Sequence, residues 1–152
     1  MTLRCPWRGR GRGVSALEFA LSAPLVLFVM LGIADFGNAL QQSIRLEGAA
    51  RAGAQIALAS PYDTAAIRTA TMANLAGWQL AADGGDVTFA TQNWCQCATD
   101  PINPANAFSC TNYHGNCPDV AHLASVTVSR PYQALLLVPL SSLRGNVELR
   151  LR

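Results

Sequence analysis

An apolar stretch near the N-terminus is the feature that most limits what this chain can fold into. Val14–Ala34 is 21 residues long and contains a single charged residue, Glu18. A helix of 20 residues is about 30 Å long, which matches the thickness of the hydrocarbon core of a bilayer. The stretch therefore predicts one membrane-spanning helix over residues 14–34.

The segment before this stretch is basic. It carries four arginines, and no acidic residue precedes Glu18. By the positive-inside rule, we expect a cytoplasmic N-terminus, with the chain from residue 35 onward on the other side of the membrane. Residues 1–13 are interpreted as a leader. A conventional signal peptide is the competing interpretation, but the apolar run is longer than a usual h-region and no small-x-small site closes it.

Glu18 requires a physical explanation, because a carboxylate in hydrocarbon is costly. At the centre of a bilayer a charged residue costs about 2.5–3.5 kcal/mol on insertion scales, and such residues are candidates for a function. Glu18 lies about one turn inside the apolar run, so its cost is smaller. It either reaches back to water or to Arg12 at the membrane interface, or it serves the motif around it.

The residues around Glu18 form a recognisable pattern. Gly13 ends the basic leader, Glu18 stands at the fifth position beyond it, and Phe19 follows. This pattern resembles the processing site of type IV pilins and pseudopilins. With residues 20–25 and 32–37 included, it is similar more specifically to the TadE-like pseudopilins of tight-adherence (Flp-type) pilus systems.

The resemblance, which covers roughly residues 9–60, implies a function. A prepilin peptidase would cut between Gly13 and Val14, and the chain would be a pseudopilin-like structural subunit for pilus assembly in the bacterial inner membrane. The implied partners are other pseudopilins, the major pilin, the prepilin peptidase, the inner-membrane assembly platform and the lipid bilayer. In the family, Glu18 would pair with the new amine of a neighbouring subunit. Independently of the family, Val14 and Glu18 are four residues apart, so their charges can meet on one face of a helix.

The helix is expected to continue beyond the membrane, over residues 35–60, where no proline occurs. Apolar residues at Phe36, Leu40, Ile44 and then Ile56 predict one stripe along this extension. We expect the exported domain to cover the apolar face of the helix.

A row of small residues, Ala49, Gly53 and Ala57, lies in the second half of this extension. Small residues at this spacing let two helix backbones approach closely. The row therefore predicts a close helix contact, either within the fold or between subunits; the sequence leaves both open.

Residues 61–152 predict a small exported α+β domain. Asp63 is a candidate cap for a helix over residues 64–76, with an apolar face of Ile67, Ala70, Met72 and Leu75. Alternating residues predict strands over 87–91, 123–132 and 147–152, with the last strand antiparallel to the middle one and the first beside it. The predicted fold class is thus α+β, a long transmembrane helix that continues into a domain with a second helix and a small antiparallel sheet.

Four cysteines lie in a loop-rich block, residues 92–119, on the exported side: Cys95, Cys97, Cys110 and Cys117. An even number of cysteines in an oxidising compartment predicts a disulfide framework, here two bridges. A bridge between Cys95 and Cys97 would be tight, so we favour each of them reaching to Cys110 or Cys117. Cys5 lies in the leader.

A zinc site in this block is the alternative to disulfides, with His114 as a further ligand. The spacing lacks the CxxC pairs of structural zinc sites, so no metal and no cofactor is predicted. Free or redox-active thiols remain a third interpretation. His114 and His122 are interpreted as surface polar residues.

Composition and motifs argue against two classes of function. From Val14 onward seven arginines face nine acidic residues, a net charge of −2, so there is no basic patch for nucleic acid. No phosphate-binding loop, nucleophile elbow or metal-spaced His/Glu cluster occurs, so the chain is not predicted to be an enzyme. The alternative to a pilus subunit is an uncleaved single-pass membrane protein whose disulfide-stapled outer domain is a binding or adhesion module.

Overall fold

A computed structural model describes residues 12–110, 117, 119–134 and 140–151 of the chain. Two predictions fall outside the described residues: residues 1–11 of the predicted leader, with Cys5, and the surface position of His114.

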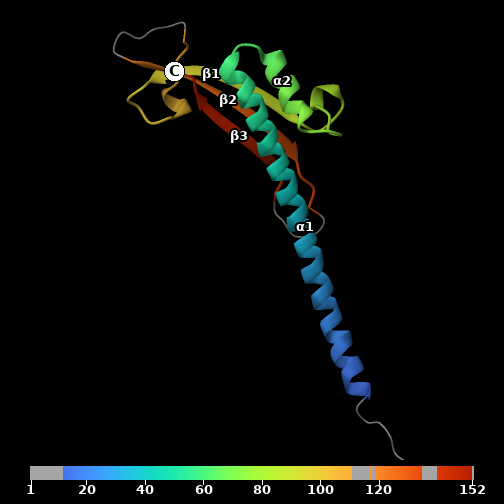
Figure 1. Cartoon of the computed structure of the whole chain (residues 1–152). Helices are drawn as coiled ribbons and strands as arrows, with labels where there is room; N and C mark the ends of the chain where they lie inside the picture. Colours follow the sequence, from blue (N-terminus) through green and yellow to red (C-terminus); the bar gives the residue numbers. More distant parts are fainter. Residues whose placement is uncertain (1–11, 111–116, 118, 135–139, 152) are drawn as a thin grey trace, which may run out of the picture.

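The molecule is built on one long helix, α1 (Arg12–Ala59), of 48 residues. At 1.5 Å per residue it is about 72 Å long. Figure 1 shows that its N-terminal half projects from the rest of the molecule, whereas its C-terminal half lies across the sheet. The helix passes through Pro24 without an interruption, although proline removes one backbone donor. The predicted continuation of the apolar helix into the domain is confirmed.

The domain adds a second helix and a three-stranded sheet. The elements are α2 (Thr64–Ala73), β1 (Thr88–Cys97), β2 (Val120–Pro131) and β3 (Ser142–Arg150), with short 3₁₀ helices η1 (Ala81–Asp83) and η2 (Pro104–Asn106). The strand order is β1-β2-β3, and both pairings are antiparallel. This arrangement confirms the predicted α+β class, the small antiparallel sheet and the antiparallel pairing of its last strand with the middle one.

All three strands are longer than their sequence patterns predicted, β1 and β3 most clearly. β1 extends to Cys97, inside the block that was predicted to be a loop, because residues up to Cys97 pair with β2. β3 begins at Ser142, ahead of its alternating run, and pairs with β2 through Gly145. A pattern of alternating side chains marks only the half-buried part of a strand, whereas backbone pairing continues past it.

α2 begins as its capping residue predicted. The carboxylate of Asp63 accepts a hydrogen bond from the backbone N–H of Ala66 at 2.9 Å. The helix ends at Ala73 rather than at residue 76, and its fully buried positions are Ile67 and Thr71. Thr71 was not part of the predicted apolar face of this helix. Its buried hydroxyl donates to the carbonyl of Ile67 at 2.8 Å, which satisfies its hydrogen-bonding need.

The main hydrophobic core lies between the two helices and the sheet. Val126 and Val128 of β2, predicted to share one face, are fully buried there. A smaller cluster lies on the opposite face of the sheet, because alternate residues of a strand point to opposite sides. The main core contains Ala39, Leu46, Ala49, Ala50, Ala54, Ala57, Ile67, Leu75, Leu80, Val87, Val126, Val128, Tyr132 and Leu143.

The apolar stripe predicted along the helix extension lies on the face of α1 that the domain leaves exposed, not on the face that it covers. Phe36, Leu40 and Ile44 are each more than half exposed, and Ile56 is 36% exposed. The domain instead covers the face that carries Ala39, Leu46, Ala49, Ala50, Ala54 and Ala57. The large side chains were expected to face the domain. The small residues face it instead, because they allow the sheet to approach the helix backbone.

Gly145 of β3 shows how close this approach is. A Cβ at Gly145 would lie 2.4 Å from the carbonyl carbon and oxygen of Leu46 and 2.6 Å from the backbone nitrogen of Glu47. β3 therefore crosses directly over the backbone of α1, and no side chain fits between them.

Candidate functional site

The N-terminal part of α1 is an apolar surface without a protein partner among the described residues. From Leu17 to Ile33 its large apolar side chains are all exposed, Leu21 at 74%. Within the part of the chain that the structure describes, this is one helix that is long and apolar enough to cross a membrane. Such a surface in water would be unfavourable, so the helix fits a membrane anchor.

The residues of the proposed processing motif lie at the start of this helix. Gly13 and Val14 have helical backbone within α1. Glu18 and Phe19 follow one turn later, and both are exposed, Phe19 at 72%. Among the described residues none of the salt bridges involves Glu18. Its carboxylate is therefore presented on the bare helix, about one turn above Val14.

The bare part of the helix ends at Asp35, where the domain begins. Asp35 is fully buried, although it follows directly on the apolar stretch. The hydroxyl of Tyr132, at the end of β2, lies 2.7 Å from the carboxylate oxygen Oδ1 of Asp35 and 2.8 Å from its backbone carbonyl oxygen. The single phenolic proton is shared between these two acceptors. The contact joins the helix to the sheet at the point where the chain would leave the membrane.

The environment of Tyr132 favours its protonated form. The hydrogen bond to Asp35 raises the pKa of Tyr132 above its ordinary value of 10.0, and burial and the negative charge of Asp35 raise it further. A hydrogen bond with Asn38 acts in the opposite direction. Tyr132 is thus held as a neutral donor toward a carboxylate, which is a strong type of hydrogen bond.

A second polar contact lies close to Tyr132 in sequence. Nε of Arg130 lies 2.5 Å from a carboxylate oxygen of Asp86, and its guanidinium stacks 4.3 Å above the ring of Trp78. These contacts attach the segment after α2 to the end of β2. They stabilise the end of the domain that carries Tyr132.

The row of small residues packs inside the fold. Ala49 and Ala57 are fully buried. A Cβ at Gly53 would lie 2.2 Å from Oγ1 of Thr71 and 3.2 Å from Cγ1 of Val126. The described chain therefore uses this row for contact with α2 and β2, one of the two uses that the sequence left open.

The four exported cysteines form two bridges, Cys95–Cys110 and Cys97–Cys117. This connectivity is one of those that the sequence favoured. His122, which was interpreted as a surface polar residue, is half-buried, and its Nδ1 lies 3.3 Å from Sγ of Cys95.

Sequence reasoning missed the buried pair of Asp35 and Tyr132 and the contact of His122 with Cys95. For Asp35 a signal existed, because an acidic residue directly after an apolar run marks where a helix leaves lipid. No local signal pointed to Tyr132 or His122, since their partners lie 97 and 27 residues away in the sequence.

The N-terminal segment has a counterpart among known families. Residues 13–55 match the model of a family described as TadE-like protein. Comparisons with curated proteins and with solved structures found no match. The matched segment contains the proposed processing motif, the bare apolar helix, Asp35 and the small-residue row as far as Gly53.

Proposed function

From the TadE-like segment at residues 13–55, which associates this chain with tight-adherence pilus systems, we propose that it is a membrane-anchored, pseudopilin-like structural subunit of pilus assembly. The observation that carries the proposal is the abrupt change along α1. Up to Ile33 the large apolar side chains of the helix are exposed, and from Asp35 onward one face of the helix is buried in the core of the domain. A rigid helix that bears both an anchor and a domain suits a subunit that packs beside other helices.

The proposed location is the bacterial inner membrane, with one crossing. The basic leader favours a cytoplasmic N-terminus. The two disulfides support an exported, periplasmic or otherwise extracytoplasmic domain, because disulfides persist in oxidising compartments. Residues 14–34 then span the bilayer, residues 35–60 extend the helix, and residues 61–152 complete the domain.

Processing would occur between Gly13 and Val14 by a prepilin peptidase. The new ammonium of Val14 would then stand one turn from the exposed carboxylate of Glu18. In the assembled state Glu18 pairs with the amine of a neighbouring subunit. In lipid, this pairing offsets the cost of both charges and favours helices that pack in register.

Neighbouring subunits would meet the helix face that the domain leaves open. Phe36, Leu40 and Ile44 lie on this face and are all more than half exposed. The proposed partners are other pseudopilins, the major pilin and the inner-membrane assembly platform, and the proposed role is structural rather than catalytic.

The mature N-terminus tests this function. We expect mass analysis of the protein from cells with an intact prepilin peptidase to show a chain that begins at Val14. Cells without the peptidase should yield a chain that still carries residues 1–13. Replacing Gly13 by Leu should abolish the size change, whereas Gly11→Leu, a matched change of another leader glycine, should leave processing intact.

A chain that retains residues 1–13 in both kinds of cell would overturn the proposed processing. It would favour the alternative, an uncleaved membrane protein whose stapled outer domain serves binding or adhesion.

A further inference from the structure

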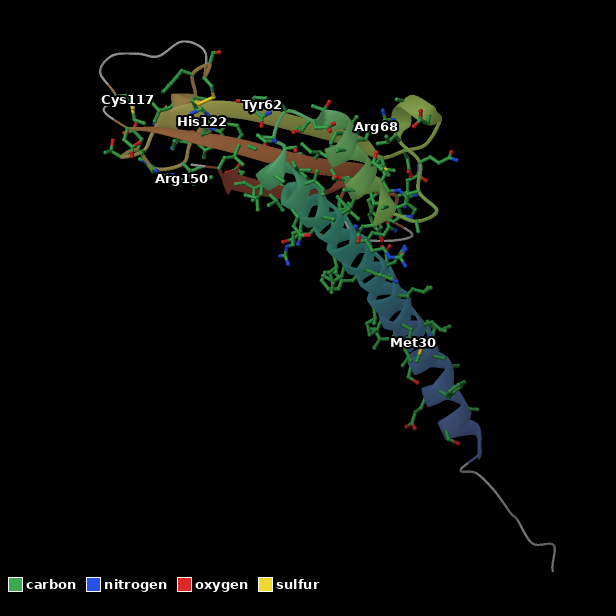
Figure 2. The ribbon with its side chains drawn as sticks, turned by 45° about the horizontal axis from the view of Figure 1, so that its top comes forward. Met30, Tyr62, Arg68, Cys117, His122 and Arg150 are labelled. Atoms are coloured by element: carbon green, nitrogen blue, oxygen red, sulfur yellow. A yellow bond between two sulfur atoms is a disulfide. The ribbon has the colours of Figure 1, made fainter. Side chains whose placement is uncertain are left out.

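Three possible metal ligands meet at the end of the sheet that lies far from the anchor. They are Sγ of Cys95, Sγ of Cys110 and a ring nitrogen of His122, and these ligand atoms all lie within 4.8 Å of one another. Cys95 is fully buried, whereas Cys110 and His122 are half-buried. Figure 2 shows His122 at this end of the sheet, on the same side of the molecule as Cys117 and far from Met30.

The sheet itself brings these residues together. Cys95 of β1 and His122 of β2 are direct partners in the antiparallel register, so their side chains point to the same face. On the other edge of β1, Phe108 forms an isolated bridge with Cys95. Cys110 follows two residues later. The three side chains therefore converge from three adjacent segments of backbone.

The loop that carries Cys110 is held by more than its disulfide. The backbone N–H of Cys95 donates to the carbonyl of Phe108 at 3.0 Å, and the N–H of Phe108 donates to the carbonyl of Cys95 at 2.8 Å. The buried side chain of Gln96 adds a second attachment. Its Nε2 lies 3.3 Å from the carbonyl oxygens of both Asp100 and Pro101, and its Oε1 lies 3.3 Å from the backbone nitrogen of Asn103.

These attachments predict what reduction of the Cys95–Cys110 bridge would do. The backbone pairing and the Gln96 contacts do not involve the bridge, so they would still hold residues 100–108 beside β1 when the bridge opens. The two thiols would then remain beside the imidazole of His122. A preorganised pair of thiols with one imidazole is a typical ligand set for zinc.

We propose that Cys95, Cys110 and His122 form a Zn²⁺ site that exists only in the reduced protein and replaces the disulfide as the cross-link of the loop. A dithiol reductant first opens the bridge: its two thiols become a disulfide, and Cys95 and Cys110 each gain one proton. Zn²⁺ then binds the two thiolates and Nδ1 of His122, and the two thiol protons pass to solvent. A water molecule occupies the fourth position.

The chemistry of the site fits this ion. Two thiolates neutralise the charge of Zn²⁺, so a half-buried complex carries no net charge. At bond lengths of about 2.3 Å to sulfur and about 2.0 Å to nitrogen, tetrahedral ligands lie roughly 3.3–3.8 Å apart. Nδ1 of His122 already lies 3.3 Å from Sγ of Cys95, and the two sulfurs, which are bonded to each other in the oxidised protein, move apart into this range once the bridge opens.

In the oxidised protein His122 has a different role. A sulfur in a disulfide carries no proton, so the contact at 3.3 Å makes Nδ1–H of His122 the donor to Cys95. Metal binding requires the other neutral tautomer, with the proton on Nε2. The site thus switches between a disulfide that accepts a hydrogen bond and a metal that accepts a nitrogen lone pair.

Cobalt titration of the full chain in detergent tests the proposal. Co²⁺ is the probe because tetrahedral thiolate coordination gives it a sulfur-to-metal charge-transfer band and visible d–d bands. All samples carry Cys5→Ser, and reduction uses a phosphine, which adds no competing thiol. We expect one Co²⁺ per reduced chain, displaced by one Zn²⁺, and no binding to the oxidised chain.

The matched variants separate this site from other ligands. Cys97→Ser combined with Cys117→Ser should leave cobalt binding unchanged, whereas Cys110→Ser should abolish it. His122→Gln should weaken it at least roughly tenfold, since even residues behind metal ligands typically change affinity by that much. Far-UV circular dichroism checks that each variant is folded.

Two results would overturn the proposal. One is a reduced, folded wild-type chain that binds no cobalt. The other is cobalt binding that is equally tight in His122→Gln, which would place the metal elsewhere. Neither result bears on the proposed pilus function, which is tested by processing of the N-terminus.

Discussion

The hydroxyl of Tyr132 lies 2.7 Å from the carboxylate of Asp35, and this hydrogen bond joins α1, at the point where its bare part ends, to the end of strand β2. Both residues are almost fully buried, although one follows directly on an apolar stretch that fits a membrane anchor. The pair determines where the free helix ends and the domain begins. It therefore attaches the end of β2 to α1 at this point.

Removing the hydroxyl of Tyr132 should loosen this junction. For Tyr132→Phe we expect the Tm of the domain to fall by roughly 4–8 °C, the shift typical of losing one net hydrogen bond in a domain of this size. Thermal unfolding of the full chain in detergent measures it. Tyr62→Phe is the matched control, because Tyr62 is 72% exposed and should leave the Tm unchanged. Equal Tm values for wild type and Tyr132→Phe would show that the hydrogen bond does not hold the junction.

The same pair predicts a loss of stability at alkaline pH. Asp35 raises the pKa of Tyr132 above 10.0, so the folded state holds the phenolic proton more tightly than the unfolded state. The stability that results is fully present below pH 10.0 and is lost as the pH rises through the raised pKa. Denaturant titrations at a series of pH values should show wild type declining above pH 10 more steeply than Tyr132→Phe. Parallel curves for the two proteins would contradict this linkage.

The crossing of β3 over α1 predicts that Gly145 tolerates no side chain. In Gly145→Ala the new Cβ would meet the backbone of Leu46, and backbone cannot move aside as a flexible side chain can. We expect a loss of about 1–3 kcal/mol in the free energy of unfolding, the usual cost of overpacking. Gly48→Ala is the matched control on α1, since nothing lies within 4 Å of that position, and it should be neutral or stabilising by up to about 1 kcal/mol. A neutral Gly145→Ala would mean that the strand and the helix are further apart.

The face of α1 that the domain covers can be tested by truncating one residue on each side. Leu46 is fully buried, so Leu46→Ala should cost about 2–5 kcal/mol in denaturant unfolding. Ile44 is 64% exposed, so Ile44→Ala should change the free energy of unfolding by less than about 0.5 kcal/mol. A larger loss in the free energy of unfolding for Ile44→Ala than for Leu46→Ala would show that the face with Phe36, Leu40 and Ile44 is the buried one.

Glu18 is expected to act in assembly and not in folding or insertion. In Glu18→Ala the amine of Val14 loses its partner, so assembly of pili should fall by roughly tenfold or more, as expected when an ion pair is broken in a medium of low dielectric. Membrane fractionation should show the same amount of anchored protein as in wild type. Glu47→Ala is the control, because Glu47 forms an exposed pair with Arg51 on the same helix and should leave piliation normal. Normal piliation in Glu18→Ala would refute the pairing.

Much of the architecture followed from local patterns. The length and apolarity of residues 14–34, the alternation around Val126 and the cap at Asp63 each depend on residues close in sequence, and the structure bears them out. Alternation also marked the positions of the three strands, although it found only part of each strand.

The candidate sites depended on contacts that no local pattern contains. The stripe from Phe36 to Ile44 was assigned to the core on the size of its side chains, but the sheet packs on the opposite face. Which face is covered depends on how closely β3 can approach the helix, and Gly145 lies directly over the backbone of Leu46 and Glu47. Asp35 found its partner 97 residues away.

The sequence by itself determined that this protein has an apolar helix with an acid near its start, a basic segment before it and four cysteines in the part that follows. These properties follow from composition and spacing along one dimension. Only the tertiary structure decided that Asp35 is buried against Tyr132 and that His122 lies against Cys95. The physical reason is that these contacts depend on strand register and on helix–sheet distance, which the whole packed domain sets together.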